Sequence, residues 1–136
     1  MAQTRGEKNC NPGNIERNAT LWQGMAADQS ADSRFIVFIN PGWGIRALAK
    51  ILLTYNKQGL NTVRKIIDKW APPVENDTGA YVNHVAEMVG VDEDTVIQVR
   101  DPETLELLTK GIIAHENGRI IYDDALIVSA IDMALS

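Results

Sequence analysis

Glu116 is the residue in this sequence that is best suited to acid chemistry. It follows Leu108 by eight positions and Ile112 by four, so in a helix the three side chains share one apolar face. A carboxyl group that is partly withdrawn from water and lies near the negative end of a helix dipole tends to stay protonated. Cleavage of a glycosidic bond needs such an acid, because the leaving oxygen must receive a proton. We therefore expect Glu116 to act as a general acid and then as a base; the alternative is a surface carboxylate at a fraying helix end.

Glu7 and Glu75 are the candidates for a second catalytic carboxylate. Glu7 lies between Arg5 and Lys8, whose charges favour an ionised carboxylate if they stay close in the fold. Glu75 lies in Glu75-Asn76-Asp77-Thr78, which also has the composition of a helix start. Hydrolases need two carboxyl groups about 5 to 5.5 Å apart if retaining and about 6.5 to 9.5 Å apart if inverting, whereas lytic transglycosylases resemble enzymes with a single Glu. The alternative for both residues is a solvated charge in a polar loop.

Amide and aromatic side chains supply candidates for sugar binding. Asn11 and Asn14 flank Pro12-Gly13, where their amides can bond sugar hydroxyls and N-acetyl groups or, equally, their own backbone. Trp22 lies in a polar stretch and is the best candidate for stacking on a sugar face, because aromatic residues at helical spacing more often belong to the core. The candidate substrate-binding residues are Asn11, Asn14, Trp22, Tyr81 and His115.

Helical periodicity dominates the sequence after Pro41. Apolar residues recur every three or four positions in segments that begin after a capping residue or at a proline and end at glycine or before proline. The expected helices run from Pro41 to Gly59, from a cap at Asn61 to the residue before Pro72, from Asp77 or Thr78 to Gly90, from Asp101 to Asn117, and from near Asp123 to Leu135.

The segment before these helices is predicted to be a loop with a minimal β-hairpin. Thr4 to Asn18 is rich in Asn, Gly and Pro, which favours turns. Phe35-Ile36-Val37-Phe38 is typical of a short strand, and the stretch from Leu21 to Gln23 is its expected partner. The predicted fold class is therefore mainly α, with about five helices and one minimal hairpin in a single domain that spans residues 1–136.

The composition excludes several classes of function. With 136 residues, of which 45% are hydrophobic and 23% charged, the chain has the usual size and composition of one globular domain. A net charge of -5 argues against a nucleic-acid partner, which needs a basic patch. Cys10 is the single cysteine and no Cys/His cluster has ligand spacing, so neither a metal nor another cofactor is expected. The polar start and the lack of a long apolar run predict synthesis in the host cytoplasm without a signal peptide, and no membrane partner.

Several short motifs are spread over nearly the whole chain. They are Arg5-Gly6-Glu7-Lys8-Asn9-Cys10-Asn11-Pro12-Gly13-Asn14-Ile15, Trp22-Gln23-Gly24, Phe35 to Phe38, Gly44-Ile45-Arg46-Ala47, Thr62-Val63, Trp70-Ala71-Pro72-Pro73-Val74-Glu75-Asn76, Tyr81 and His115-Glu116-Asn117-Gly118. Together they resemble a set of phage and prophage proteins that are often described as structural or virion proteins. The resemblance implies a phage or prophage origin and other phage structural proteins as partners.

Two of these motifs are also similar to parts of flagellar-type glucosaminidases and lysozyme-like enzymes. In those enzymes a helix ends in a catalytic Glu that is followed by a small residue and Gly, and an Asn-rich loop comes afterwards. His115-Glu116-Asn117-Gly118 is similar to the helix end and Asn11-Pro12-Gly13-Asn14-Ile15 to the loop, in the opposite order, as in a circularly permuted domain. Pro12 and Gly13 replace the aromatic and Gly pair of that loop. The similarity implies a lysozyme-like domain.

The sequence therefore predicts a peptidoglycan glycan-strand cleaving enzyme of phage or prophage origin. Its activity would be that of a muramidase, a glucosaminidase or a lytic transglycosylase, with Glu116 as general acid and base. The alternative is a non-enzymatic virion or tail component that binds cell-wall glycan or another phage protein, because a fold does not determine a function. Either protein would act at the cell wall or within the virion, with peptidoglycan glycan strands as its expected partner.

Overall fold

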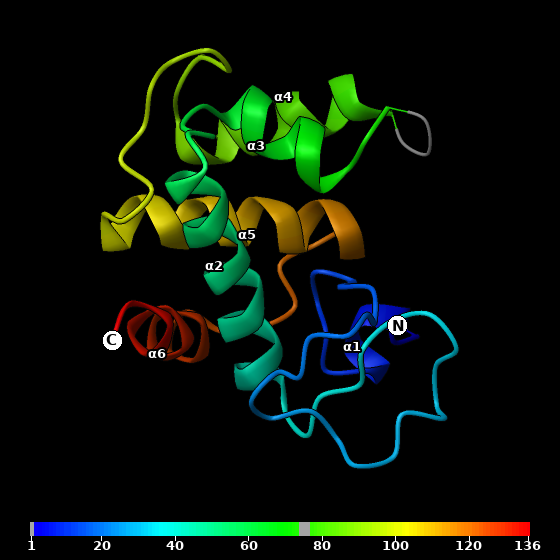
Figure 1. Ribbon diagram of the computed structural model, residues 1–136. Helices are drawn as coiled ribbons and strands as arrows, with labels where there is room; N and C mark the ends of the chain where they lie inside the picture. Colours follow the sequence, from blue (N-terminus) through cyan, green and yellow to red (C-terminus); the bar gives the residue numbers. More distant parts are fainter. Residues whose placement is uncertain (1, 74–76) are drawn as a thin grey trace.

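The structure is a computed structural model that describes residues 2–73 and 77–136. Six helices and no strand occur among these residues, which confirms the mainly α fold class (Figure 1). The helices are α1 (Arg5–Lys8), α2 (Pro41–Lys57), α3 (Val63–Trp70), α4 (Thr78–Val89), α5 (Pro102–Asn117) and α6 (Asp124–Leu135).

Short polar side chains begin the long helices, as the sequence predicts. The carboxylates of Asp77, Asp101 and Asp123 each accept a hydrogen bond from a backbone N–H in the first turn of α4, α5 and α6. For α3 the predicted cap was one residue early: the cap is Thr62, whose hydroxyl accepts from the backbone N–H of Lys65. At the other end of α5, Gly118 has a left-handed φ of 79°, which ends the helix directly after Asn117.

The helix α1 was not predicted from the sequence. Its four residues follow Thr4, whose hydroxyl accepts from the backbone N–H of Glu7, while the Glu7 carboxylate accepts from the backbone N–H of Thr4. This reciprocal capping box stabilises a single turn inside a segment whose Asn, Gly and Pro content otherwise favours loops.

The expected hairpin is reduced to two isolated antiparallel bridges, Glu16 with Phe35 and Met25 with Phe38. The stretch from Leu21 to Gln23 is not the partner. Three backbone N–H groups of this part of the chain donate to three separate segments: Ile36 to the carbonyl of Ile15, Phe38 to that of Asn9, and Ile39 to that of Gly24. Because no single segment lies alongside the whole run, a continuous ladder cannot form.

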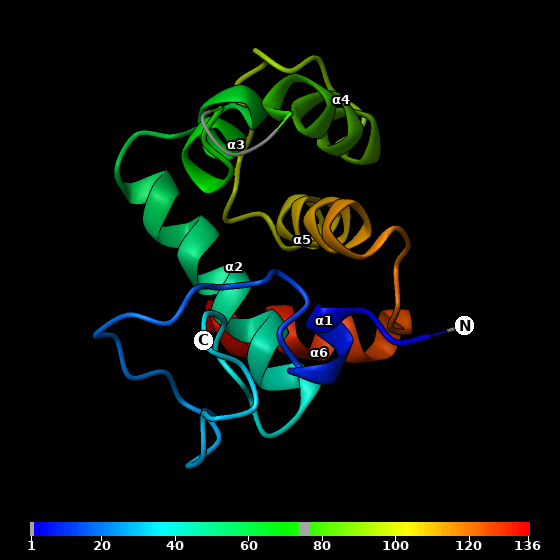
Figure 2. The ribbon, with the colours of Figure 1, turned by 90° about the vertical axis from the view of Figure 1, so that its right-hand side faces the viewer.

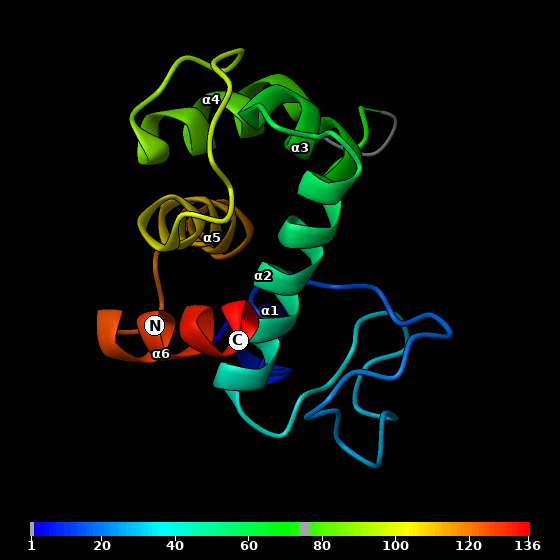
Figure 3. The ribbon, with the colours of Figure 1, turned by 60° about the vertical axis from the view of Figure 1, so that its left-hand side comes forward.

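The helix α2 occupies the centre of the arrangement. Its N-terminal half lies between α6 and the irregular segment that leads from α1 to α2, and the three ribbon views agree on this (Figures 1, 2 and 3). The helices α3 and α4 pack beside each other, and α5 packs against α4, α6 and α2. In the described part of the chain no helix is long and apolar enough to cross a bilayer.

Candidate functional site

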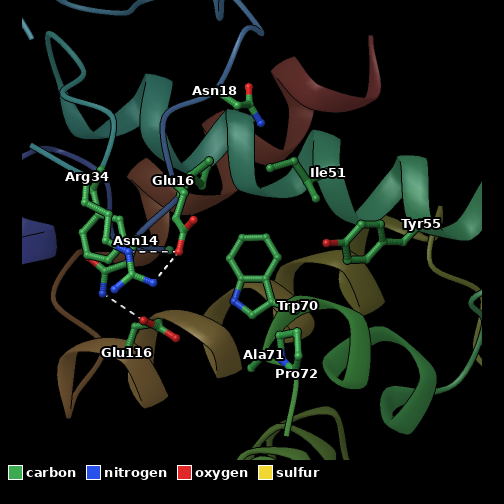
Figure 4. A pocket seen from close by; sticks show the side chains of 13 residues that line it. Asn14, Glu16, Asn18, Arg34, Ile51, Tyr55, Trp70, Ala71, Pro72 and Glu116 are labelled. Atoms are coloured by element: carbon green, nitrogen blue, oxygen red, sulfur yellow. Dashed lines mark hydrogen bonds and ion pairs between the residues drawn. The ribbon is translucent and has the colours of Figure 1, made fainter. Parts of the chain in front are cut away.

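A groove of about 660 Å³ opens where five parts of the chain meet (Figure 4). It lies between the loop around Asn14, the segment with Arg34 and Phe35, the side of α2, the end of α3 and the last turn of α5. The lining residues are Gly13, Asn14, Ile15, Glu16, Asn18, Arg34, Phe35, Ile51, Tyr55, Trp70, Ala71, Pro72 and Glu116.

Glu116 lies in the last turn of α5 and lines one end of the groove. Leu108 and Ile112, on the same face of the helix, are fully buried, so the periodicity predicted the direction of this face correctly. The two carboxylate oxygens of Glu116 have separate donors: Asn14 Nδ2 at 2.8 Å from Oε1 and the Tyr81 hydroxyl at 2.8 Å from Oε2. The carboxylate is therefore fixed in position from two sides.

Tyr81 supports Glu116 from the protein interior. Its side chain is only 2% exposed. Burial raises the pKa of the Tyr81 hydroxyl well above its usual range, and the adjacent negative charge of Glu116 raises it further. The hydroxyl therefore stays protonated and remains a donor. The indole of Trp70 acts on the pKa of the same hydroxyl in the opposite direction, so side chains from α3, α4 and α5 meet at one phenol.

The loop around Asn14 is held against the end of α5 by Asn117. The Asn117 amide donates to the carbonyl of Pro12 at 2.8 Å and accepts from the hydroxyl of Thr4 at 2.6 Å. Asn14 itself has a left-handed φ of 51°, a conformation that asparagine tolerates better than most residues. These contacts bring an early segment and a late segment of the chain together at Glu116.

The other side of the groove is apolar and aromatic. Trp70, at the end of α3, lies across from Glu116 (Figure 4). Ile51 and Tyr55 line the groove from α2, and the Tyr55 hydroxyl is directed toward Trp70. Burial raises the pKa of Tyr55, so its hydroxyl is neutral. Both Trp70 and Tyr55 occur at helical spacing, where aromatic residues more often belong to the core, yet both are only partly buried and line the groove.

Glu16 and Arg34 complete the polar side of the groove, and no sequence pattern had indicated either residue. The Arg34 Nε donates to Glu16 Oε1 at 3.0 Å, and the guanidinium lies 5.1 Å from the ring centroid of Phe35. Both charged side chains are more than half exposed. They reach the groove through contacts between distant loop segments, which leave no periodic pattern in the sequence.

Asp32 organises the loop that carries Arg34 and Phe35. Its carboxylate accepts from Arg5 Nε at 2.6 Å, from Asn9 Nδ2 at 2.8 Å and from the backbone N–H groups of Arg34 and Phe35, both at 2.8 Å. The hydrogen bond from Arg5 is the main cause that holds the pKa of Asp32 well below its usual range. Sequence analysis did not single out this residue.

Two of the predicted site residues contribute to structure away from the groove lining. Glu7 caps α1 and accepts from Arg119 at 3.2 Å. Asn11 is fully buried, and its amide donates to the carbonyls of Ile15 and Ile36. These are the local backbone contacts that asparagine makes in loops.

Three further candidates, Trp22, Tyr81 and His115, also lie outside the groove lining. Trp22 packs against the hydrophobic core, and the ring of His115 stacks on Tyr81 with centroids 3.9 Å apart. Glu75 lies outside the described residues. Within the ranges that the structure describes, no group of three or more His, Cys, Asp and Glu side chains is arranged to hold a metal ion.

The groove has the surface chemistry of a site for an extended, uncharged and polar ligand. Aromatic and apolar groups on one side suit C–H faces, and amide and carboxylate groups on the other suit hydroxyl and N-acetyl groups. A carboxyl group fixed at one end adds the means to move a proton to or from a bound ligand.

Comparison with known proteins identifies a relative from a bacteriophage. No protein-family model matches the chain. Protein P5 of Pseudoalteromonas phage PM2 is 39% identical over 118 residues, which cover 84% of this chain and 71% of the phage protein. Identity of this level over most of both chains indicates a common origin. The chain therefore belongs to the family of Protein P5 of phage PM2.

Proposed function

We propose that this chain is a virion component of a phage that binds the glycan strands of peptidoglycan in the groove beside Glu116. The composition of the groove carries the proposal. Trp70 and Tyr55 line one side, and Asn14, Glu16 and Glu116 line the other (Figure 4). A strand of N-acetylated amino sugars offers apolar ring faces and polar edges, which match both sides. The relationship to a phage protein supports the virion location.

The proposal includes one lysozyme-like domain over residues 1–136. Buried apolar side chains from Ile15 near the start to Ala134 near the end belong to one cluster. The end of α5 and the loop around Asn14, whose motifs are similar to those of lysozyme-like enzymes, contact each other through Glu116. Both observations support a single unit with the groove at its centre.

Binding is tested by sedimenting the purified protein with peptidoglycan sacculi. The wild type is expected to pellet with the sacculi, and Trp70→Ala is expected to stay in the supernatant, because it removes the aromatic wall. Trp22→Ala is the matched control, since it removes a partly buried indole that does not line the groove. If Trp70→Ala pellets as well as the wild type, or if the wild type does not pellet at all, the proposal that glycan binds in this groove is wrong.

Cleavage of the bound strand is the second candidate function, and the fixed position of Glu116 favours it. In this reaction the Glu116 carboxyl group gives its proton to the leaving glycosidic oxygen while the bond from that oxygen to the sugar C1 breaks. Either water or the sugar's own C6 hydroxyl then bonds to C1, and the Glu116 carboxylate takes up the proton that this nucleophile loses. The first course is hydrolysis and the second leaves a 1,6-anhydro sugar.

Cleavage is tested by treating sacculi with the wild type and with Glu116→Gln, followed by mass spectrometry of the released fragments. Reducing-end products from the wild type alone would indicate a hydrolase, and anhydro ends would indicate a lytic transglycosylase. If neither protein releases fragments while both still pellet with sacculi, the chain is a binding component without this activity.

A further inference from the structure

The two histidines of this chain form a pair between α4 and α5. The Nδ1 atoms of His84 and His115 are 3.1 Å apart, and the ring centroids are 5.3 Å apart. At this distance one nitrogen donates and the other accepts, so at least one ring must lack a proton on Nδ1. While this hydrogen bond lasts, the two rings can both be neutral or can share one extra proton, but they cannot both be protonated.

The pair is in direct contact with the support of Glu116. The ring of His115 stacks on Tyr81 at 3.9 Å with an interplanar angle of 28°, and the Tyr81 hydroxyl donates to Glu116 Oε2. A movement of His115 therefore displaces the phenol that fixes the carboxylate.

The charges around His115 decide how the pair responds to acid. Burial lowers the pKa of His115, and the second histidine lowers it further by repulsion. Glu116 on α5 and Asp77 at the start of α4 act in the opposite direction but do not outweigh these two causes. Once one ring carries a charge, the burial of His115 and the like charge across the 3.1 Å contact both oppose a second proton.

We propose that His84 and His115 are positioning residues that hold Tyr81 and Glu116 in place at neutral pH and release them when both rings are protonated. Two protonated rings face each other with donors only and with like charges, so the contact between them opens. The Glu116 carboxylate then loses the fixed donor Tyr81. The consequence for ligand affinity rests on the proposed glycan-binding function, whereas the opening of the pair does not.

The opening is tested without any ligand by following the imidazole nitrogens and the Trp70 indole N–H by NMR from pH 8 to pH 4.5. Because the chain has only two histidines, the imidazole signals are simple to assign. We expect two steps for the wild type, and a shift of the Trp70 signal with the second step, since the Trp70 indole interacts with the Tyr81 hydroxyl. Independent single steps with an unchanged Trp70 signal would overturn the proposal.

The functional consequence is tested by sacculus binding at pH 7.5 and pH 5 with the wild type and His84→Asn. An asparagine amide can replace Nδ1 as a hydrogen-bond partner and cannot be protonated. Loss of one hydrogen bond to a charged group corresponds to an affinity change of about tenfold. We therefore expect the wild type to bind sacculi about tenfold more weakly at pH 5 than at pH 7.5, and His84→Asn to show no such loss.

The outcomes of the two measurements separate the two proposals. Equal loss of affinity for both proteins in acid would overturn the role of the pair while leaving glycan binding intact. If the wild type binds no sacculi at any pH, the glycan proposal fails; the NMR titration then still decides whether the histidine pair opens.

Discussion

The carboxylate of Glu116 depends on donors from two directions, and Tyr81 is the more deeply buried of them. The phenol donates to Glu116 Oε2 at 2.8 Å. A buried hydroxyl that donates to a carboxylate contributes to rigidity, because removing it leaves a carboxylate oxygen without this partner.

The variant Tyr81→Phe is expected to lower the free energy of unfolding by about 1 to 3 kcal/mol, since Glu116 loses a buried donor to its carboxylate. The matched control is Tyr122→Phe. The Tyr122 hydroxyl is buried without a hydrogen-bond partner, so its removal is expected to be neutral or slightly stabilising. Urea denaturation measures both, and equal losses in the two variants would contradict the role assigned to Tyr81.

Asp32 is the residue whose ionisation matters most for the loop beside the groove. Its pKa is lower in the folded protein than in the unfolded chain, chiefly because Arg5 donates to it. A carboxyl group of this kind adds stability above its unfolded pKa, and this stability is lost as the pH falls below about 4.

We therefore expect Asp32→Asn to be less stable than the wild type at pH 7 and to lose less stability between pH 5 and pH 3. The amide cannot bind a proton in this range, so its acid dependence is smaller. Thermal unfolding across this range measures the difference, with Asp132→Asn on the exposed side of α6 as the control. Parallel curves for wild type and Asp32→Asn would show that Asp32 does not carry the acid sensitivity.

At the level of the elements, the close approach of α2 to the loop after α1 depends on a glycine. A Cβ atom added to Gly44 would lie 2.0 Å from the carbonyl oxygen of Cys10, which is backbone and cannot move aside alone. By contrast, a Cβ on Gly79 in α4 would be 3.8 Å from its nearest neighbour, a side-chain oxygen of Asp77.

Gly44→Ala is therefore expected to destabilise the protein by about 1 to 3 kcal/mol or more through the forced shift of the backbone. Gly79→Ala is expected to stabilise it by about 0.5 to 1 kcal/mol, because alanine is the better helix former and its Cβ meets no obstacle among the residues that the structure describes. Chemical denaturation of Gly44→Ala and Gly79→Ala tests both predictions. A neutral effect of Gly44→Ala would mean that the loop after α1 is not packed against α2 as described.

The helices could be predicted from the sequence because their signals are local. Asp101, Pro102 and Gly118 mark both ends of α5 within the segment itself, and the spacing from Leu108 to Glu116 indicates which face is buried. The bridges at Phe35 and Phe38 could not be predicted, since three separate segments supply their partners. Strand formation depends on a neighbour, and the pattern of one segment does not reveal it.

The candidate site was predictable only in part for the same reason. Glu116 and Asn14 stood out by position and composition, and the structure brings them into contact at 2.8 Å. Arg34 lies in the loop whose backbone Asp32 binds, and Glu16 is paired with Arg34. Neither residue has a sequence pattern that distinguishes it from any exposed charge. Long-range hydrogen bonds, rather than local preference, decide which polar residues line the groove.

At the level of the whole molecule, the net charge of -5 predicts how ionic strength affects binding to an anionic cell wall. Like charges repel, and the screening length falls from about 30 Å at 0.01 M salt to about 10 Å at 0.1 M. Raising the salt concentration over this range is therefore expected to strengthen binding to sacculi that carry anionic polymers and to leave binding to a neutral chitin oligosaccharide unchanged. Co-sedimentation and calorimetry measure the two ligands. A steep loss of sacculus binding with salt would instead indicate that a basic surface, not the groove, makes the contact, because charge-driven capture weakens as counterions compete.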